Sequence, residues 1–123
     1  MERKAFTVSV ADEAHLVEAD YVGLVSGNDV PDKLERSGFH VTRSEFVDAP
    51  VIDELPLVLE CRLFSYDPNT HFMVGEIVNA GADEAGMIDP AKLKPLTFDP
   101  ANGTYWSLGE KMGKAFSDGS QLK

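Results

Sequence analysis

The sequence predicts a single α+β domain in which short helices accompany antiparallel strands. Three patterns predict it: apolar alternation over Lys4–Val10, helical spacing over Ala11–Val25, and two apolar runs separated by turn formers at Asp67–Thr70. A chain of 123 residues is long enough for one hydrophobic core and too short for two. We therefore expect residues 1–123 to form one domain.

The first element is a strand with one apolar face. Phe6, Val8 and Val10 alternate with Thr7 and Ser9, and this period of two is typical of a half-buried strand. A domain that opens on a strand needs a neighbour for it. We therefore expect this strand to pair with another.

Two helices are expected next. The apolar residues at helical spacing are Ala14, Val17, Tyr21 and Leu24, and two acidic residues, Asp12 and Glu13, lie in the first turn, where the helix dipole favours negative charge. Gly27 stands where a left-handed residue would end the helix over residues 11–25. Pro31 and Gly38 then bracket a short second helix over residues 31–37.

The strongest β pattern predicts a hairpin. Residues 56–66 and 71–80 are rich in Val, Leu, Ile and Phe, and the four turn formers Asp67–Thr70 separate them. If Tyr66 faces His71, one face of the hairpin carries Leu59, Cys61, Leu63, Val74, Glu76 and Val78. A buried, unpaired Glu76 would be costly, so we expect it to reach the rim or to find a donor such as Arg62.

The C-terminal third is less regular. Two short strands are expected at residues 96–98 and 104–106. Beyond them, Leu108, Met112 and Phe116 recur at a helical spacing of four, which Gly109 and Gly113 on the same stripe weaken. We interpret this stripe as a packing surface rather than a cofactor contact.

Charge and cysteine content exclude several classes of function. The formal charge of −10 disfavours nucleic acid and anionic membrane surfaces as partners. The single cysteine, Cys61, excludes an internal disulfide, favours a reduced cytoplasmic compartment, and is interpreted as a small buried residue without a redox role. No apolar run approaches the roughly 20 residues that span a bilayer.

Familiar catalytic motifs are missing from the sequence. Residues 23–27 differ by one position from a Gly-x-Ser-x-Gly nucleophile elbow and lack the preceding strand. The histidines, His15, His40 and His71, have no metal-ligand spacing, and there is no Walker loop. The residue patterns therefore yield no catalytic residue and no metal site.

Five segments together carry a resemblance to a known family. They are residues 19–39, 49–63, 70–78, 88–96 and 105–116. In their order and spacing they resemble flavoredoxins and their relatives in the flavin reductase-like family. The resemblance implies part of a split β-barrel, mostly antiparallel with short flanking helices, which dimerises and holds FMN non-covalently at or near the subunit interface for electron transfer or flavin reduction.

The chain departs from the family pattern in two places. Many flavin-reducing relatives carry Gly-Asp-His where this chain has Asn69-Thr70-His71, which favours the flavoredoxin branch over direct nicotinamide use. Relatives also carry several barrel strands, with much of the FMN contact, before the position that matches Met1. The chain is then a fragment, or a natural short form that completes its barrel with another chain. Because an unpaired strand edge invites strand addition, we expect a homodimer or higher oligomer.

The resemblance implies four candidate cofactor residues around the end of the first helix. Ser26, Gly27 and Asn28 match the family's loop that approaches the flavin, and Lys33 offers a cation to its phosphate. The family often has Arg where Asn28 stands, which weakens a charge-based role for this loop. The alternative interpretation is that these residues cap helices and form a solvated face.

Three further candidates lie later in the chain. His71 is a flavin-side or nicotinamide-side residue by the resemblance, or else a hairpin-end histidine paired with Tyr66. Tyr105 and Trp106 cover a flavin face, or else belong to the core.

Two hypotheses about function follow. The first is an FMN-binding redox protein of the cytoplasm that exchanges electrons with a redox partner protein or NAD(P)H. This hypothesis favours an oxidoreductase enzyme. The alternative is a non-catalytic, oligomeric remnant of the split barrel that no longer binds flavin.

Overall fold

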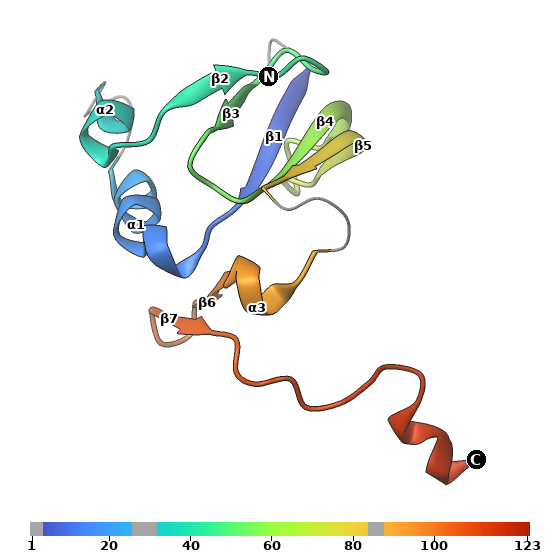
Figure 1. Cartoon of the computed structure of the whole chain (residues 1–123). Coiled ribbons are helices and arrows are strands. Elements are labelled where there is room, and N and C mark those ends of the chain that lie inside the picture. Colours follow the sequence, from blue (N-terminus) through green and yellow to red (C-terminus); the bar gives the residue numbers. More distant parts are fainter. Residues whose placement is uncertain (1–3, 26–31, 84–87) are drawn as a thin grey trace.

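The computed structural model describes residues 4–25, 32–83 and 88–123. These residues form three small antiparallel sheets with short helices beside them (Figure 1). In chain order the strands and α-helices are β1 (Ala5–Val10), α1 (Leu16–Leu24), α2 (Lys33–Ser37), β2 (Val41–Arg43), β3 (Pro50–Ile52), β4 (Leu57–Tyr66), β5 (Met73–Ala82), α3 (Pro90–Leu93), β6 (Leu96–Asp99) and β7 (Thr104–Ser107). Two 3₁₀ helices, Glu13–His15 and Asp118–Leu122, lie before α1 and near the C-terminus.

The main sheet has the strand order β1–β4–β5, with both pairs antiparallel. Ala5 lies opposite Arg62, and Val10 lies opposite Leu57. The expected strand at the start of the chain, and its need for a neighbour, are therefore confirmed. The smaller sheets pair β2 with β3 and β6 with β7.

The predicted β4–β5 hairpin forms, but its loop is longer than expected. Tyr66 pairs with Met73, so residues 67–72 form a six-residue loop in place of the predicted four. Within it, the Asp67 amide donates to the Phe72 carbonyl at 2.9 Å, and the His71 amide donates to the Asp67 carbonyl at 2.7 Å. Because these bonds keep residues 71–72 in the loop, β5 begins at Met73, two residues later than predicted.

The predicted hairpin face was partly wrong because the register shifts twice, between Glu60 and Cys61 and between Leu63 and Ser65. Residues opposite each other in a ladder share a face. Cys61 lies opposite Ile77, whereas Glu76 lies opposite Arg62 and therefore belongs to the other face. Glu76 is exposed, so it carries no burial cost.

The apolar face of the main sheet centres on Cys61, which is 3% exposed. Phe6 lies opposite Cys61 in the ladder, and its ring crosses to Gly75. A Cβ atom at residue 75 would lie 2.7 Å from Phe6 Cε1 and 3.3 Å from Cys61 Cβ. Gly75 therefore makes the room that the Phe6 ring occupies, and the expectation of a buried Cys61 is confirmed.

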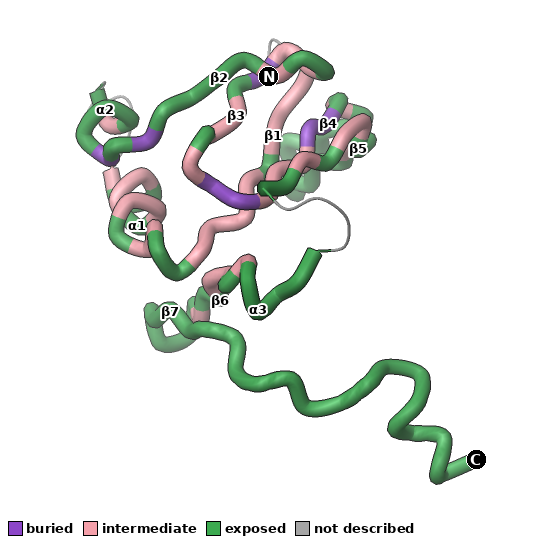
Figure 2. Tube along the Cα trace, viewed as in Figure 1, coloured by how far each residue is buried: buried purple, intermediate pink, exposed green. Residues whose placement is uncertain are grey.

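The opposite face of the sheet is polar and is covered by the segment that contains β2 and β3. Glu60 is 5% exposed and accepts hydrogen bonds from Ser44 Oγ, at 2.7 Å, and from Asn79 Nδ2. Thr7 Oγ1 donates to the Pro50 carbonyl at 2.6 Å. Figure 2 shows that burial is concentrated in β4 and in the connections before β2, β3 and β4.

The first helix begins later than predicted. Residues 11–12 are extended because the Ala11 carbonyl accepts from the Leu96 amide at 2.9 Å and Asp12 bridges to Pro95. A 3₁₀ helix, Glu13–His15, then leads into α1. The second helix ends at Gly38, whose φ of 84° is the left-handed conformation expected of it. Gly27 and Pro31, which were expected to end and begin helices, lie outside the described residues.

The two C-terminal strands occur where they were predicted, as β6 and β7. The helical spacing that follows them does not produce a helix over residues 108–116. Residues 108–114 have no regular structure, and Met112 and Phe116 are 98% and 107% exposed. A short segment with two glycines has little helix propensity of its own, and helices of this length depend on packing of their apolar face.

The Glu60 cluster gives a prediction about stability. Asn79→Ala removes one of the two side-chain donors to a buried carboxylate, and hydrogen bonds to charged groups contribute about 1.5–3 kcal/mol. We expect a loss of this size in the free energy of unfolding, measured by urea denaturation at one fixed protein concentration. Asn69→Ala, in the exposed hairpin loop, is the matched control and should change stability little. Equal losses for the two variants would contradict a stabilising role for the cluster.

Candidate functional site

Lys33, one of the sequence-predicted residues, lies against the C-terminal end of α1. Its Nζ atom donates to the carbonyl oxygens of Val22, at 3.1 Å, and Val25, at 3.3 Å. The last carbonyls of a helix lack partners within the helix, and a lysine there also interacts favourably with the helix dipole. Lys33 therefore caps α1, as the alternative interpretation expected. An ammonium has three hydrogens, so this geometry leaves one for a ligand.

Tyr105 reaches the same helix from β7. Its hydroxyl donates to Asp20 Oδ1 at 2.7 Å, across 85 residues of sequence, and its ring centroid lies 5.5 Å from that of Phe98. The hydrogen bond to Asp20 raises the pKa of the Tyr105 phenol. Trp106, the next residue, is 61% exposed and donates from Nε1 to Thr104 Oγ1 at 2.9 Å. Trp106 is therefore not a core residue.

Sequence analysis missed a second cation beside Lys33. Arg36 Nε donates to Asp32 Oδ2 at 3.1 Å on an exposed face of α2. The pKa of the Arg36 guanidinium is raised, chiefly by this bond to Asp32 and further by the nearby Tyr21 phenol. The spacing of three between Lys33 and Arg36 places both on one side of a helix, and this was the available signal.

Asp20 lies on α1, and Lys33, Arg36 and Tyr105 reach it from α2 and β7; we call these four, with Trp106, the residue after Tyr105, the α1 site. Its chemistry suits a planar, phosphorylated cofactor, because two cations can bind a phosphate and an exposed indole can cover a ring. Ser26, Gly27 and Asn28 follow α1 directly in sequence and lie outside the described residues. The α1 site thus joins three of the four described candidates.

His71, the fourth sequence-predicted residue that the structure describes, lies in the loop between β4 and β5. Its Nδ1 atom is 3.2 Å from the Tyr66 hydroxyl, the contact that the alternative interpretation expected. β1 leads into α1 from Val10, and Val10 pairs with Leu57 at the far end of β4 from Tyr66. At about 3.3 Å per residue, β4 separates the two ends by roughly 30 Å. One chain does not bring His71 to the α1 site.

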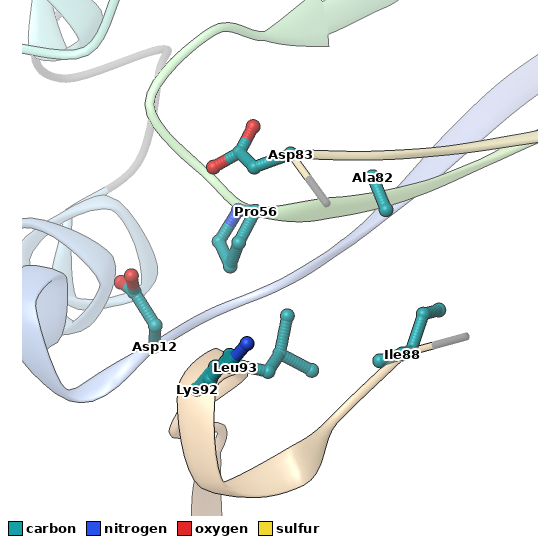
Figure 3. A pocket seen from close by; sticks show the side chains of 7 residues that line it. All are labelled: Asp12, Pro56, Ala82, Asp83, Ile88, Lys92 and Leu93. Atoms are coloured by element: carbon teal, nitrogen blue, oxygen red, sulfur yellow. The ribbon is translucent and has the colours of Figure 1, made fainter. Parts of the chain in front are cut away.

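Two hollows lie near α3. The smaller, of about 260 Å³, is drawn in Figure 3 between the ends of β1 and β5 and the start of β4. It is lined by Asp12, Pro56, Ala82, Asp83, Ile88, Lys92 and Leu93. The larger, of about 750 Å³, is lined by Glu13, Asp89, Pro90, Ala91, Lys94, Leu108, Gly109, Glu110 and Lys111. The described candidates from the sequence line neither hollow.

The bond between Tyr105 and Asp20 predicts a pH dependence. Because the folded pKa of Tyr105 is raised, the bond stabilises the fold below the unfolded phenol pKa of about 10 and is lost as pH rises through the folded value. Asp20→Asn should lower the pKa of this phenol in an ultraviolet titration, read against Tyr105→Phe to assign the signal. Glu18→Gln, on the same helix, is the control. An unchanged titration in Asp20→Asn would refute the coupling.

Comparison with solved structures identifies close structural relatives. Flavoredoxin of Desulfovibrio vulgaris (Miyazaki F) is 36% identical with a TM-score of 0.88, and the match covers 96% of this chain and 66% of that chain. A flavoredoxin from Methanosarcina acetivorans is 33% identical with a TM-score of 0.87, covering 99% and 67%. The FMN-binding domain of a flavin reductases-like enzyme from Shewanella baltica is 24% identical with a TM-score of 0.74, covering 88% and 62%, and supports the fold alone.

These matches confirm the α+β split-barrel fold class, and this chain spans about two thirds of the length of the flavoredoxins. Within the described ranges, no helix has the length and apolar character needed to cross a bilayer. No curated protein sequence gives a significant match. The family model for the flavin reductase like domain matches residues 1–104, most of the chain. The chain therefore belongs to the flavin reductase-like family, as its five sequence segments indicated.

Proposed function

We propose that this chain is part or all of an FMN-binding flavoprotein of the flavoredoxin type, acting in electron transfer or flavin reduction. The observation that carries the proposal is the identity of 33–36% with two flavoredoxins over at least 96% of the chain. The proposal includes a single domain over residues 1–123 and a cytoplasmic location. Bound FMN would supply the redox chemistry, and the protein would supply binding and orientation.

In this proposal the α1 site holds the cofactor. Lys33 has one ammonium hydrogen beyond its two bonds to α1, and Arg36 adds a guanidinium from the same helix face. Both favour the phosphate end of the cofactor, and Ser26, Gly27 and Asn28, which follow α1 in sequence, stay proposed cofactor residues. The indole of Trp106, 61% exposed, is available to cover one ring face.

Tyr105 acts in the proposal as a positioning residue. Its bond to Asp20 fixes β7 against α1 and thereby fixes the backbone that carries Trp106. A tilted contact with Phe98 restrains the Tyr105 ring further. The indole would therefore be held in place before a ligand arrives, which lowers the entropic cost of binding.

The proposal also includes a homodimer, with a redox partner protein or NAD(P)H as the source of electrons. Both outer strands of the main sheet, β1 and β5, are edge strands among the described residues. A second copy can cover such edges. It can also bring its own His71 to the α1 site, which one chain does not do.

FMN binding tests the proposal directly. We expect the full chain to quench flavin fluorescence on titration and its melting temperature to rise with added FMN. Lys33→Gln should weaken binding about tenfold, because a charge-assisted hydrogen bond to phosphate contributes of the order of 1.5–3 kcal/mol. Lys92→Gln, on α3, is the matched control and should bind normally.

A colourless protein that neither binds FMN nor gains thermal stability from it would overturn the flavoprotein proposal. That outcome would favour the alternative of a non-catalytic, oligomeric remnant of the fold. Loss of binding in Lys92→Gln but not in Lys33→Gln would place the cofactor near α3 and would reject the α1 site.

A further inference from the structure

The last 16 residues form an arm that leaves the body of the molecule after β7 (Figure 1). We call residues 108–123 the C-terminal arm, and all of them are exposed (Figure 2). Its large apolar side chains and their exposed fractions are Leu108 52%, Met112 98%, Phe116 107% and Leu122 87%. A run of exposed apolar side chains on a segment that leaves the body of the molecule is typical of an interaction surface.

A local turn holds Phe116 in this exposed position. The Lys114 amide donates to Asp118 Oδ2 at 3.1 Å, and the Asp118 amide donates to the Lys114 carbonyl at 3.3 Å. The Asp118 carboxylate occupies the space that a Cβ atom at residue 113 would need, so Gly113 permits this clamp. Phe116 has a φ of 61°, a conformation that is costly for a bulky residue and is typical of functional positions.

The charge of the arm indicates what it binds. The arm carries three lysines and two carboxylates, a net charge of +1, which leaves −11 for residues 1–107 of a chain whose total is −10. Lys111 and Lys114 lie within five residues of Phe116. Its partner should therefore present an apolar face among carboxylates, and a second copy of this chain is such a partner.

The β4–β5 hairpin offers a face of this kind. Large exposed apolar side chains near its loop end form what we call the hairpin surface: Phe64 (79% exposed), Phe72 (74%) and Val74 (51%). The carboxylates of Asp67 and Glu76 are exposed on the same hairpin. Each aromatic side chain can bury about 150–250 Å². Phe64, Phe72 and Phe116 together approach the roughly 800 Å² per partner that a stable interface buries.

We propose that the C-terminal arm of each subunit docks on the hairpin surface of a second copy, with Phe116 as its anchor. This rests on the homodimer in the proposed function and names the surfaces that form it. Two-fold symmetry makes the exchange reciprocal, so the two arms contact the two hairpins.

Oligomeric state at micromolar concentration tests the proposal, with folding of each variant checked by circular dichroism. Light scattering should show a dimer for the wild type, and its dissociation constant should rise about tenfold or more in Phe116→Ser and in Phe72→Ser. Phe46→Ser, also at an exposed position (58%), is the matched control and should remain dimeric. The double variant should raise the dissociation constant of the dimer little more than either single variant does, because both substitutions remove the same contact.

A photo-crosslinking residue at position 116 identifies what the arm contacts. A crosslinked product of twice the chain mass that maps to residues 64–77 supports the proposal. A crosslink within one chain, or to another region of the second copy, overturns it. If the wild type is a dimer and Phe116→Ser dimerises equally well, docking of the arm is refuted while the homodimer stands. A monomeric wild type refutes both proposals. FMN binding, measured separately, reports on the flavoprotein proposal alone.

Discussion

The structure depends on β4, the strand that is hydrogen-bonded along both edges, to β1 on one side and β5 on the other. Successive side chains of a strand point to opposite faces, so the buried neighbours Glu60 and Cys61 serve two different layers. Glu60 fixes the β2–β3 segment through Ser44, while Cys61 supports the Phe6 ring. A slip of one residue in this strand would place the Glu60 carboxylate in the apolar layer and Cys61 among polar groups.

The α1 site depends on the pairing of β1 with β4. β1 leads into α1 through residues 11–15, so the register of β1 against β4 influences where the helix begins. The C-terminal third then returns to this point: the Leu96 amide binds the Ala11 carbonyl, and the Tyr105 hydroxyl binds Asp20. The site is therefore held by bonds between segments at opposite ends of the chain. Such a site is more rigid than one carried by a single loop, which agrees with the proposed role of this site in binding a flat ring.

Local features of the fold could be predicted from the sequence, and tertiary features could not. Alternation identified β1, and the left-handed conformation at Gly38 follows from glycine's freedom there. The hairpin was expected, but its bulge between Glu60 and Cys61 has no sequence signal, so the facing residues were partly misassigned. Likewise, helix capping was one of two interpretations of Lys33, and only the packing of α2 against α1 decides that Lys33 caps α1.

The balance between polar and apolar groups explains why one chain leaves so much surface for a partner. In the described part of the chain, no buried side-chain nitrogen or oxygen lacks a hydrogen-bond partner, whereas no large side chain is fully buried. Short-range contacts can satisfy polar groups in a small chain, but apolar burial requires volume. The apolar side chains of the arm and the hairpin therefore remain exposed after the polar network is complete. A second chain would cover them without breaking that network, so hydrophobic burial would drive assembly at little polar cost.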